Sequence, residues 1–298
     1  MSLPKQPRSM LVAGAGAIGS EFADFYQTIG TEVTLVEFLP RIVPNEDEEV
    51  SRQLERSFKK RKMKILTSSS VESVDISDDI CRVAVKTPGG TEQIDVDIIL
   101  SAVGVTPNTE GIGLEEAGVK TEKGKVVVDE YYSTSVSGVY AIGDIVSGPA
   151  LAHVASAEGI VCAEKIAGRD VNPLDYGNIP ACTYTTPEIA SVGLTEAAAK
   201  EAGYEIKTGK FPFTASGKAS ASGMRDGFVK LVFDSEYGEL LGAHMIGANV
   251  TEMISEIVVA RKLETTAREI IKSVHPHPTM SESIMEAAAA AYGEVIHL

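Results

Sequence analysis

Apolar and polar positions follow two periods along residues 9–107, and these periods predict an α/β unit. The apolar run Ser9–Ala13 predicts a short strand, and Glu32–Glu37 (EVTLVE) has the composition of a buried parallel strand. Between them, Ile18–Ile29 has the period of a helix, which Gly30 is expected to end. The apolar residues on one side of this helix are Ile18, Phe22, Phe25, Tyr26 and Ile29.

The rest of this region predicts a charged amphipathic helix at Asp47–Lys62, followed by short strands. Pro88-Gly89-Gly90 predicts a turn, and Asp97–Val103 is a continuous apolar strand that ends at Gly104 and Pro107. Four segments are expected to alternate as antiparallel strands: Lys64–Leu66, Val71–Ile76, Ile80–Lys86 and Glu92–Val96.

Two further regions follow, with predicted boundaries in Thr106–Thr109 and Asn172–Asn178, so that we expect domains at 1–107, 108–176 and 177–298. The middle region predicts strands at Val126–Asp129 and Gly138–Ile142 and a helix at Leu151–Ala167. The last region predicts strands at Ile189–Gly193, Glu205–Phe213, Phe228–Asp234 and Leu240–Ile246, and helices at Val250–Arg261, Thr266–Ser273 and Met280–Tyr292.

Composition narrows the function classes. The chain has 298 residues and a net charge of -15, which disfavours binding to nucleic acids and to anionic membranes. No apolar run approaches the roughly 20 residues that span a bilayer, and the N-terminus has no signal-peptide pattern. Cys81, Cys162 and Cys182 form no CxxC or zinc spacing, so we expect a reducing compartment, the cytoplasm, and no metal site.

The first motif that carries chemistry is Gly14-Ala15-Gly16-Ala17-Ile18-Gly19, a GxGxxG that follows a predicted strand and opens a helix. Such glycines permit a tight turn, close approach of a pyrophosphate and close packing of the helix on the strand. Glu37 ends the next strand, where a carboxylate accepts hydrogen bonds from ribose hydroxyls and repels a 2′-phosphate, so NAD is favoured over NADP. Arg41 is expected to soften this preference, and the alternative is a glycine-rich turn with a solvated glutamate.

The second and third motifs have two interpretations each. Gly138–Asp144 predicts a strand that ends in Gly-Asp, where Asp144 is either a ligand-binding residue or a turn residue. The segment Gly148–His153 then opens a helix whose free N–H groups suit a polar ligand. In His275–Glu282, the spacing of Thr279 and Glu282 predicts a capping box, and His277 with Glu282 also forms the pair that general acid–base catalysis needs. A metal site formed by His275, His277 and His297 has little support.

Taken together, the ordered motifs GAGAIGSE, VE, ILSAVGVTPNT, GVYAIGD, GPALAH and HPHPTMSE resemble the flavoprotein disulfide reductases, and within them most closely the dihydrolipoamide dehydrogenases. The resemblance covers essentially the whole chain. It implies an α/β fold with a Rossmann-like NAD domain that has three-layer features, part of the FAD domain fold, and a C-terminal α+β dimerisation domain.

The resemblance also implies roles for individual residues. Glu37 would bind the adenosine ribose, Glu21 would lie near the nicotinamide, Val71 would border the adenine, and Gly104 would approach the cofactor. Asp144 would bind the ribityl chain of FAD. His277 would be the acid–base residue for a thiol of the partner subunit, oriented by Glu282, with a cis peptide expected at His277–Pro278. The residues expected to hold the NAD pyrophosphate are Gly14, Gly16, Ala17, Ile18 and Gly19, and those expected to line the isoalloxazine are Ala150, Leu151, Ala152 and His153.

The activity that the resemblance implies is oxidation of dihydrolipoyl groups by NAD through FAD and a redox disulfide. Its implied partners are a second copy of the chain and the lipoyl domains of 2-oxoacid dehydrogenase complexes. In the family order, this sequence begins at the NAD domain, without the GxGxxG for FAD or the CxxxxC disulfide, so we expect the chain to bind NAD and to dimerise but to be inactive alone.

Three alternatives stay open. The chain is a non-catalytic module for NAD binding and dimerisation, or it serves a flavoprotein whose FAD domain is a separate chain, or it is a different disulfide reductase. Glutathione-reductase-like enzymes have basic residues where this chain has Glu37-Phe38, and mercuric-reductase-like enzymes have a C-terminal cysteine pair where this chain ends GEVIHL, so both fit less well.

Overall fold

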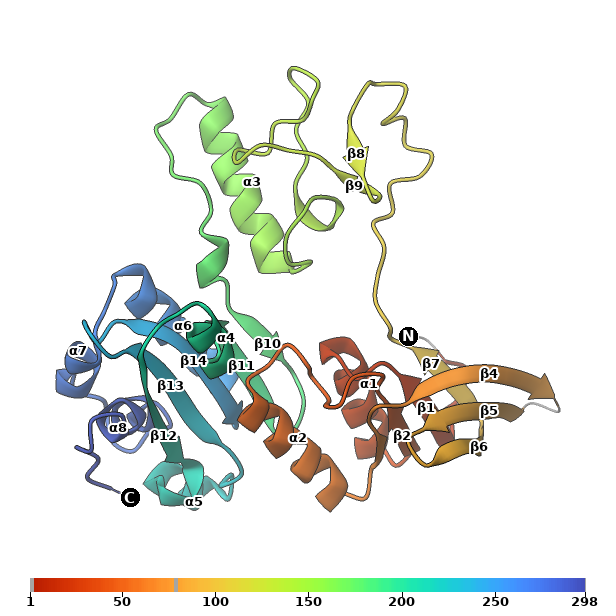
Figure 1. Ribbon diagram of the computed structural model, residues 1–298, viewed down its shortest axis with the longest axis horizontal. Coiled ribbons are helices and arrows are strands. Elements are labelled where there is room, and N and C mark those ends of the chain that lie inside the picture. The colour runs from red at the N-terminus through yellow and green to blue at the C-terminus, as the bar shows by residue number, and fades with distance from the viewer. Residues whose placement is uncertain (1–2, 78–79, 298) are drawn as a thin grey trace. The chain divides into compact units, whose positions relative to one another are not determined.

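A computed structural model describes residues 3–77 and 80–297 of the chain (Figure 1). Two compact units are distinguished, one formed by Met1–Val103 together with Pro180–Leu298, the other by Gly104–Ile179. The middle segment of the sequence is therefore a unit of its own, and the segments on either side of it pack together.

The first unit contains a four-stranded parallel sheet with the strand order β3-β2-β1-β7. The order of its strands and the helix that connects β1 to β2 are those of a Rossmann-like unit. The strand Lys64–Leu66 was expected to be antiparallel, but it extends this sheet as a parallel strand, because it returns from a helix and not from a hairpin turn. The elements are β1 (Ser9–Ala13), α1 (Ala17–Thr28), β2 (Glu32–Val36), α2 (Glu48–Lys60), β3 (Lys64–Leu66) and β7 (Ile98–Ser101).

The buried face of α1 differs from the one that the apolar stripe predicts. Ile18 and Phe25 are 50% and 56% exposed, whereas Ser20 and Ala23 are fully buried. Small side chains face the sheet because the helix lies very close to it: a Cβ atom added at Gly19 would lie 1.8 Å from the Gly14 carbonyl oxygen. Close approach therefore selects small residues where the helix meets the sheet, and Ile18, Phe25 and Ile29 lie on the outside, whereas Tyr26 is buried as the stripe predicts.

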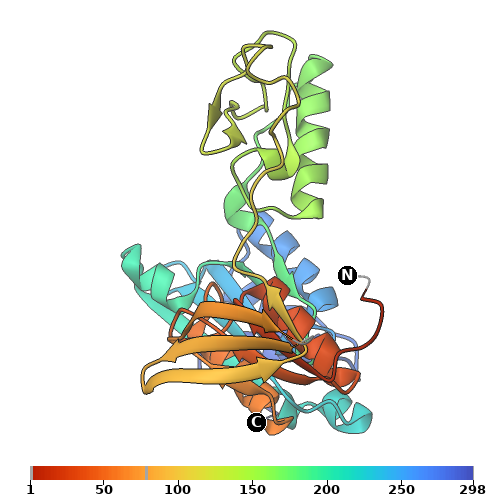
Figure 2. The ribbon, with the colours of Figure 1, turned by 90° about the vertical axis from the view of Figure 1, so that its right-hand side faces the viewer.

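A second, antiparallel sheet packs against the first and has the order β4-β5-β6 (Figure 2). Its strands are β4 (Ser70–Ser77), β5 (Ile80–Thr87) and β6 (Gly90–Val96), with the predicted turn between the last two. Val83 and Val85 of β5 belong to the same apolar cluster as Leu11 and Val36 of the parallel sheet. The alternation of β5 thus directs every second residue into the core.

The C-terminal part of the first unit is a five-stranded antiparallel sheet with the order β10-β11-β14-β13-β12, packed against helices. The four predicted strands and three predicted helices are present, with ends that differ from the prediction by at most two residues. The elements without a sequence prediction are β10 (Ala181–Thr183), α4 (Glu196–Glu201) and α5 (Gly217–Ser222). The others are β11 (Glu188–Gly193), β12 (Ile206–Pro212), β13 (Phe228–Asp234), β14 (Leu240–Gly247), α6 (Val250–Lys262), α7 (Ala267–Lys272) and α8 (Glu282–Ala290).

The second unit contains one long helix and little sheet. α3 (Ala152–Ile166) corresponds to the predicted helix, and β8 (Thr121–Glu122) pairs with β9 (Lys125–Val126). The predicted strand Gly138–Ile142 is wrong: this segment has one isolated bridge, between Tyr140 and Ser133, and then enters the short 3-10 helix η1 (Gly143–Ile145). Of its apolar residues, only Ala141 belongs to a small core, together with Val119, Val126 and Val146.

In the part of the chain that the structure describes, no helix is both long and apolar enough to cross a membrane.

Candidate functional sites

In the glycine-rich turn between β1 and α1, an added side chain would clash at two of the glycines but not at the third. Gly14 has φ +95°, and a Cβ atom there would lie 2.5 Å from the Ala102 carbonyl oxygen. Gly19 is closed by its contact with Gly14. At Gly16, by contrast, an added Cβ atom would have no neighbour within 4 Å, although this residue is the N-cap of α1. Packing within the chain explains why positions 14 and 19 are glycine. The open space at Gly16, beside the start of α1, is accessible to a ligand, and we call it the dinucleotide cradle.

Glu37 lies at this cradle. Its carboxylate is buried, and it accepts one hydrogen bond from the Ala15 N–H at 2.6 Å and another from the Leu39 N–H at 2.8 Å. No side chain in the described part of the chain caps the N-terminus of α1, so its first N–H groups, at Ala17 and Ile18, remain available to an anion. These residues suit the pyrophosphate and a ribose of a dinucleotide.

The other residues expected around the dinucleotide lie in different places. Glu21 accepts a hydrogen bond from the Tyr184 N–H at 2.8 Å, which links α1 to the segment after β10. Val71, on β4, packs against the apolar cluster that includes Val36. Arg41 donates to the Pro44 carbonyl oxygen at 2.7 Å, and Gly104 is the first residue of the second unit.

In the second unit, a buried carboxylate holds the Gly-Asp turn. Glu158 of α3 is 1% exposed and accepts hydrogen bonds from the Gly143 N–H and from the Tyr176 hydroxyl, both at 2.6 Å. Burial, and then the contact with Glu158, raise the pKa of Tyr176, so its hydroxyl stays protonated as a donor. Asp144 itself is exposed, directly after the held glycine. Sequence reasoning missed Glu158, because a glutamate inside a helix gives no signal that it is buried.

The start of α3 in this unit is the predicted second ligand-binding segment. Leu151 is the N-cap, with an extended backbone and without a side-chain cap among the described residues. Ala150 precedes it, and Ala152 and His153 open the helix. An exposed aspartate and an uncapped helix start in one unit suit a polar cofactor such as FAD.

The third motif forms an ordered histidine–carboxylate pair. His277 Nδ1 lies 2.8 Å from Glu282 Oε1, and the Thr279 N–H donates to Glu282 Oε2 at 2.7 Å. Burial raises the pKa of Glu282, but these two hydrogen bonds outweigh it, so the pKa lies below its ordinary value. The expected cis peptide at His277–Pro278 is present.

The predicted capping box at this helix is half right. Glu282 accepts from the Thr279 N–H as expected, but the Thr279 hydroxyl donates to the Pro276 carbonyl oxygen at 2.7 Å. The helix begins at Glu282, later than predicted, so Thr279 is too far from the first turn to act as its cap. Glu282 therefore accepts one hydrogen bond from the turn, at the Thr279 N–H, and is also hydrogen-bonded to His277.

A pocket of about 500 Å³ opens beside this pair, between α8, α5 and the end of β12. Its charged or titratable lining residues are His277, Glu282, Glu286 and His297. His277 is 77% exposed at its side chain, which leaves the imidazole accessible from the pocket. No group of three or more potential ligands that could hold a metal ion occurs in the described ranges.

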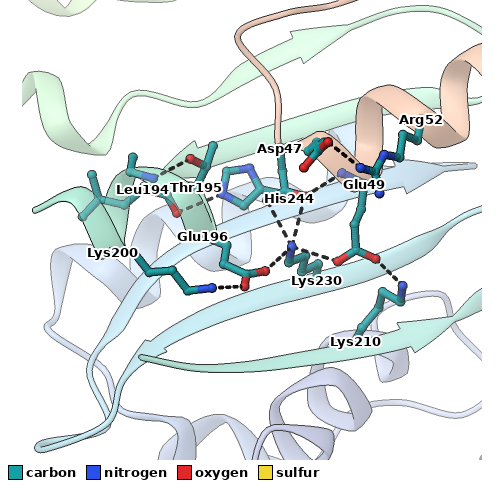
Figure 3. A network of polar contacts seen from close by, with 12 residues as sticks. Asp47, Glu49, Arg52, Leu194, Thr195, Glu196, Lys200, Lys210, Lys230 and His244 are labelled. Carbon is teal, nitrogen blue, oxygen red and sulfur yellow. Dashed lines mark hydrogen bonds and ion pairs between the residues drawn. The ribbon is translucent and has the colours of Figure 1, made fainter. Parts of the chain in front are cut away.

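A buried ion network joins the dinucleotide-binding part to the C-terminal sheet (Figure 3). Lys230 of β13 has a side chain that is 4% exposed, and its ammonium contacts Asp47, Glu49 and Glu196 at 2.8–3.1 Å. Burial lowers the pKa of Lys230, but the three carboxylates outweigh it and raise the pKa above its ordinary value. Apolar contacts of α2 with Ile189, Phe228 and Ile246 lie in the same junction.

The three cysteines are free, and Cys81 and Cys162 are buried. Burial raises the pKa of Cys162 and of the half-buried Cys182, which makes both thiols poor nucleophiles.

The family model described as pyridine nucleotide-disulphide oxidoreductase matches residues 1–159. The chain belongs to this family. A second model, described as the dimerisation domain of the same family, matches residues 179–288 and so covers the C-terminal sheet with its helices. Proteins of this family use FAD and NAD(P), and the second match indicates formation of a homodimer.

Named relatives agree with this assignment. The chain is 51% identical over 293 residues to a dihydrolipoyl dehydrogenase of Rhizobium etli and 49% identical over 298 residues to one of Zymomonas mobilis. These alignments cover 98% and 99% of the chain, but 61% and 64% of the relatives. Among solved structures, LpdA from Mycobacterium tuberculosis matches with a TM-score of 0.87 and 30% identity, over 96% of this chain and 62% of that one. The chain thus spans less than two thirds of the length of these proteins.

Proposed function

We propose that this chain supplies the dinucleotide site and the thiol acid–base pair of a dihydrolipoyl dehydrogenase, which oxidises dihydrolipoyl groups with NAD as the final electron acceptor. The observation that carries the proposal is the His277–Glu282 pair, with 2.8 Å between Nδ1 and Oε1, on an open pocket of a chain that also has a dinucleotide cradle. Acid–base catalysis on a thiol needs an oriented imidazole, and dinucleotide binding needs the cradle.

The geometry assigns a role to each member of the pair. Glu282 accepts a hydrogen bond from the Nδ1–H of His277, which leaves Nε2 to take the proton of a substrate thiol. The thiolate that results is the nucleophile for disulfide exchange. Glu282 then stabilises the imidazolium, and its low pKa keeps it ionised while it does so.

The dinucleotide site favours NAD. The ribose would lie against Glu37, whose oxygens each accept a backbone N–H and keep a further lone pair for a ribose hydroxyl. A 2′-phosphate would meet a buried negative charge there. FAD, when bound, supplies the two-electron relay between thiols and nicotinamide, and Asp144 with the start of α3 would hold part of it.

The proposed partners follow from the same assignment. A second copy of the chain would dimerise through the C-terminal sheet domain, and lipoyl domains of 2-oxoacid dehydrogenase complexes would deliver the dithiol. The free thiols of all three cysteines support action in a reducing compartment such as the cytoplasm.

Calorimetric titration of the chain with NAD+ and with NADP+ tests the dinucleotide part. We expect NAD+ to bind at least about tenfold more tightly than NADP+, the cost of placing a phosphate beside Glu37. Absence of NAD+ binding, or tighter binding of NADP+, would contradict the proposal.

The substitution His277→Gln tests the thiol part, and His275→Gln is the matched control. His275 is also paired with a glutamate, Glu256, but it is not among the residues that line the pocket. In a preparation that turns over dihydrolipoamide with NAD+, His277→Gln should lower kcat by about a hundredfold or more, and the control should not. A chain that binds NAD+ and is indifferent to both substitutions would be a dinucleotide-binding module instead.

A further inference from the structure

The pocket beside His277 contains a second histidine–carboxylate pair. His297 Nδ1 is hydrogen-bonded to Glu286 Oε1, and the Ile296 N–H donates to Glu286 Oε2 at 3.1 Å. The Glu286 side chain is 4% exposed, whereas that of His297 is 69% exposed and lines the same pocket of about 500 Å³. A buried glutamate thus holds the end of the chain so that a second imidazole lies at the pocket.

The two pairs are built in the same way from one helix. Glu282 and Glu286 lie four residues apart on α8, on the same side, and each bonds the Nδ1 atom of one histidine. In the described part of the chain, neither Nε2 atom has a hydrogen-bond partner. Each imidazole therefore has the same nitrogen available for a ligand in the pocket.

A third group also lacks a partner. Ser283, between the two glutamates on α8, is 1% exposed, lines the pocket, and its hydroxyl has no hydrogen-bond partner among the described residues. Buried hydroxyls are nearly always hydrogen-bonded, but this oxygen is fully buried, so a ligand in the pocket does not reach it in this structure.

Charge balance restricts the kind of ligand that the pocket is able to bind. The titratable groups that line the pocket are two carboxylates and two imidazoles. If both imidazoles are protonated, each is neutralised by its own carboxylate, so the pocket is able to take up two protons without net positive charge. A dithiol, the substrate class of the proposed function, is a ligand that is able to release two protons from nearby atoms.

On the basis of the thiol chemistry proposed above, we propose that the pocket accepts a dithiol and that His297 is a second acid–base residue, which serves the second sulfur. In this step the S–H bond breaks, its electron pair stays on sulfur, and the proton forms an N–H bond at His297 Nε2. Glu286 stabilises the imidazolium. No electron is transferred in the step, and His277 performs the same proton transfer at the first sulfur.

The test follows the ring nitrogens of the histidines by NMR in the full 298-residue chain, with dihydrolipoamide and, as a control, its S,S′-dimethyl derivative. We expect the signals of both His277 and His297 to move toward the imidazolium form with the dithiol, and neither to do so with the dimethyl derivative. His297→Gln should weaken dihydrolipoamide binding about tenfold, the loss of one charge-assisted hydrogen bond, and should leave NAD+ binding unchanged.

The outcomes separate this inference from the proposed function. A response of His277 alone would overturn the role of His297 and leave the proposed function intact, whereas the absence of any response would overturn both. Glu286→Gln is the second variant, because it keeps the His297 ring but removes the charge behind it. It should diminish the His297 response and leave that of His277, and an unchanged His297 response would overturn the role of Glu286.

Discussion

The buried carboxylate of Glu37 accepts a hydrogen bond of 2.6 Å from the backbone N–H of Ala15, which ties the end of β2 to the turn between β1 and α1. The second oxygen accepts from the Leu39 N–H. Glu37 is thus part of the glycine-rich turn as well as a candidate ribose ligand, and its substitution affects both stability and binding.

Glu37→Gln is expected to weaken both. An amide has one oxygen, so its NH2 group would face one of the two N–H donors, and a buried donor would lose its partner at a cost of about 1–3 kcal/mol. Chemical denaturation measures this loss, and calorimetry should show NAD+ affinity reduced at least about tenfold. Glu32→Gln, at the exposed start of β2, is the control and should change neither.

The glycines of the turn are expected to separate binding from stability. Gly16→Ala adds a methyl group to open space, so the free energy of unfolding should change by less than about 0.5 kcal/mol, while NAD+ binding is lost because the methyl group blocks the backbone. Gly19→Ala should instead destabilise the fold by about 1–3 kcal/mol, since its Cβ atom meets the Gly14 oxygen. Full NAD+ affinity in Gly16→Ala would contradict the assignment of the cradle.

The pH dependence of stability should depend on Glu46, which lies just before α2. Burial, opposed by a hydrogen bond with Ser191 and reinforced by the charge of Asp47, raises the pKa of Glu46 from 4.5 to about 7. The protonated form is therefore favoured in the folded state, so its stabilising contribution is complete below pH 4.5 and is lost as the pH rises through about 7.

Glu46→Gln is neutral at every pH and should remove this loss. Relative to the wild type, the variant should gain stability as the pH rises, by up to roughly 3 kcal/mol above neutrality. Denaturation curves at a series of pH values measure the difference, with Glu48→Gln on the exposed side of α2 as the control. A difference that is constant across the range would rule out this role.

Lys230 is expected to be essential for the junction that Figure 3 shows. Lys230→Met leaves Asp47 buried without its cation and should destabilise the chain by about 3–5 kcal/mol. Lys200→Met removes a more exposed partner of Glu196 and should cost less than about 1 kcal/mol. Equal losses of stability in the two variants, measured by thermal unfolding, would contradict the role of the buried Lys230 ammonium.

Local signals in the sequence were sufficient for much of the fold. Hydrophobic periodicity, together with turn and capping residues, predicted β1, β13 and the helix that Asp47 caps. These features depend on neighbours along the chain. They failed for the buried face of α1 and for Gly138–Ile142, where the deciding factor was contact with distant residues. The same holds for β3, whose partner strand is set by the crossover helix.

Of the candidate sites, the sequence by itself determined which chemistry was present: the glycine turn with Glu37, and His277 with Glu282 five residues later. Short separations allow this, since backbone geometry limits where such residues lie. Only the tertiary structure decided that Gly16 is open while Gly14 and Gly19 are closed, that Glu158 is buried beneath Gly143, and that His297 lies on the pocket of His277. Those relationships join residues from different elements, and packing alone brings them together.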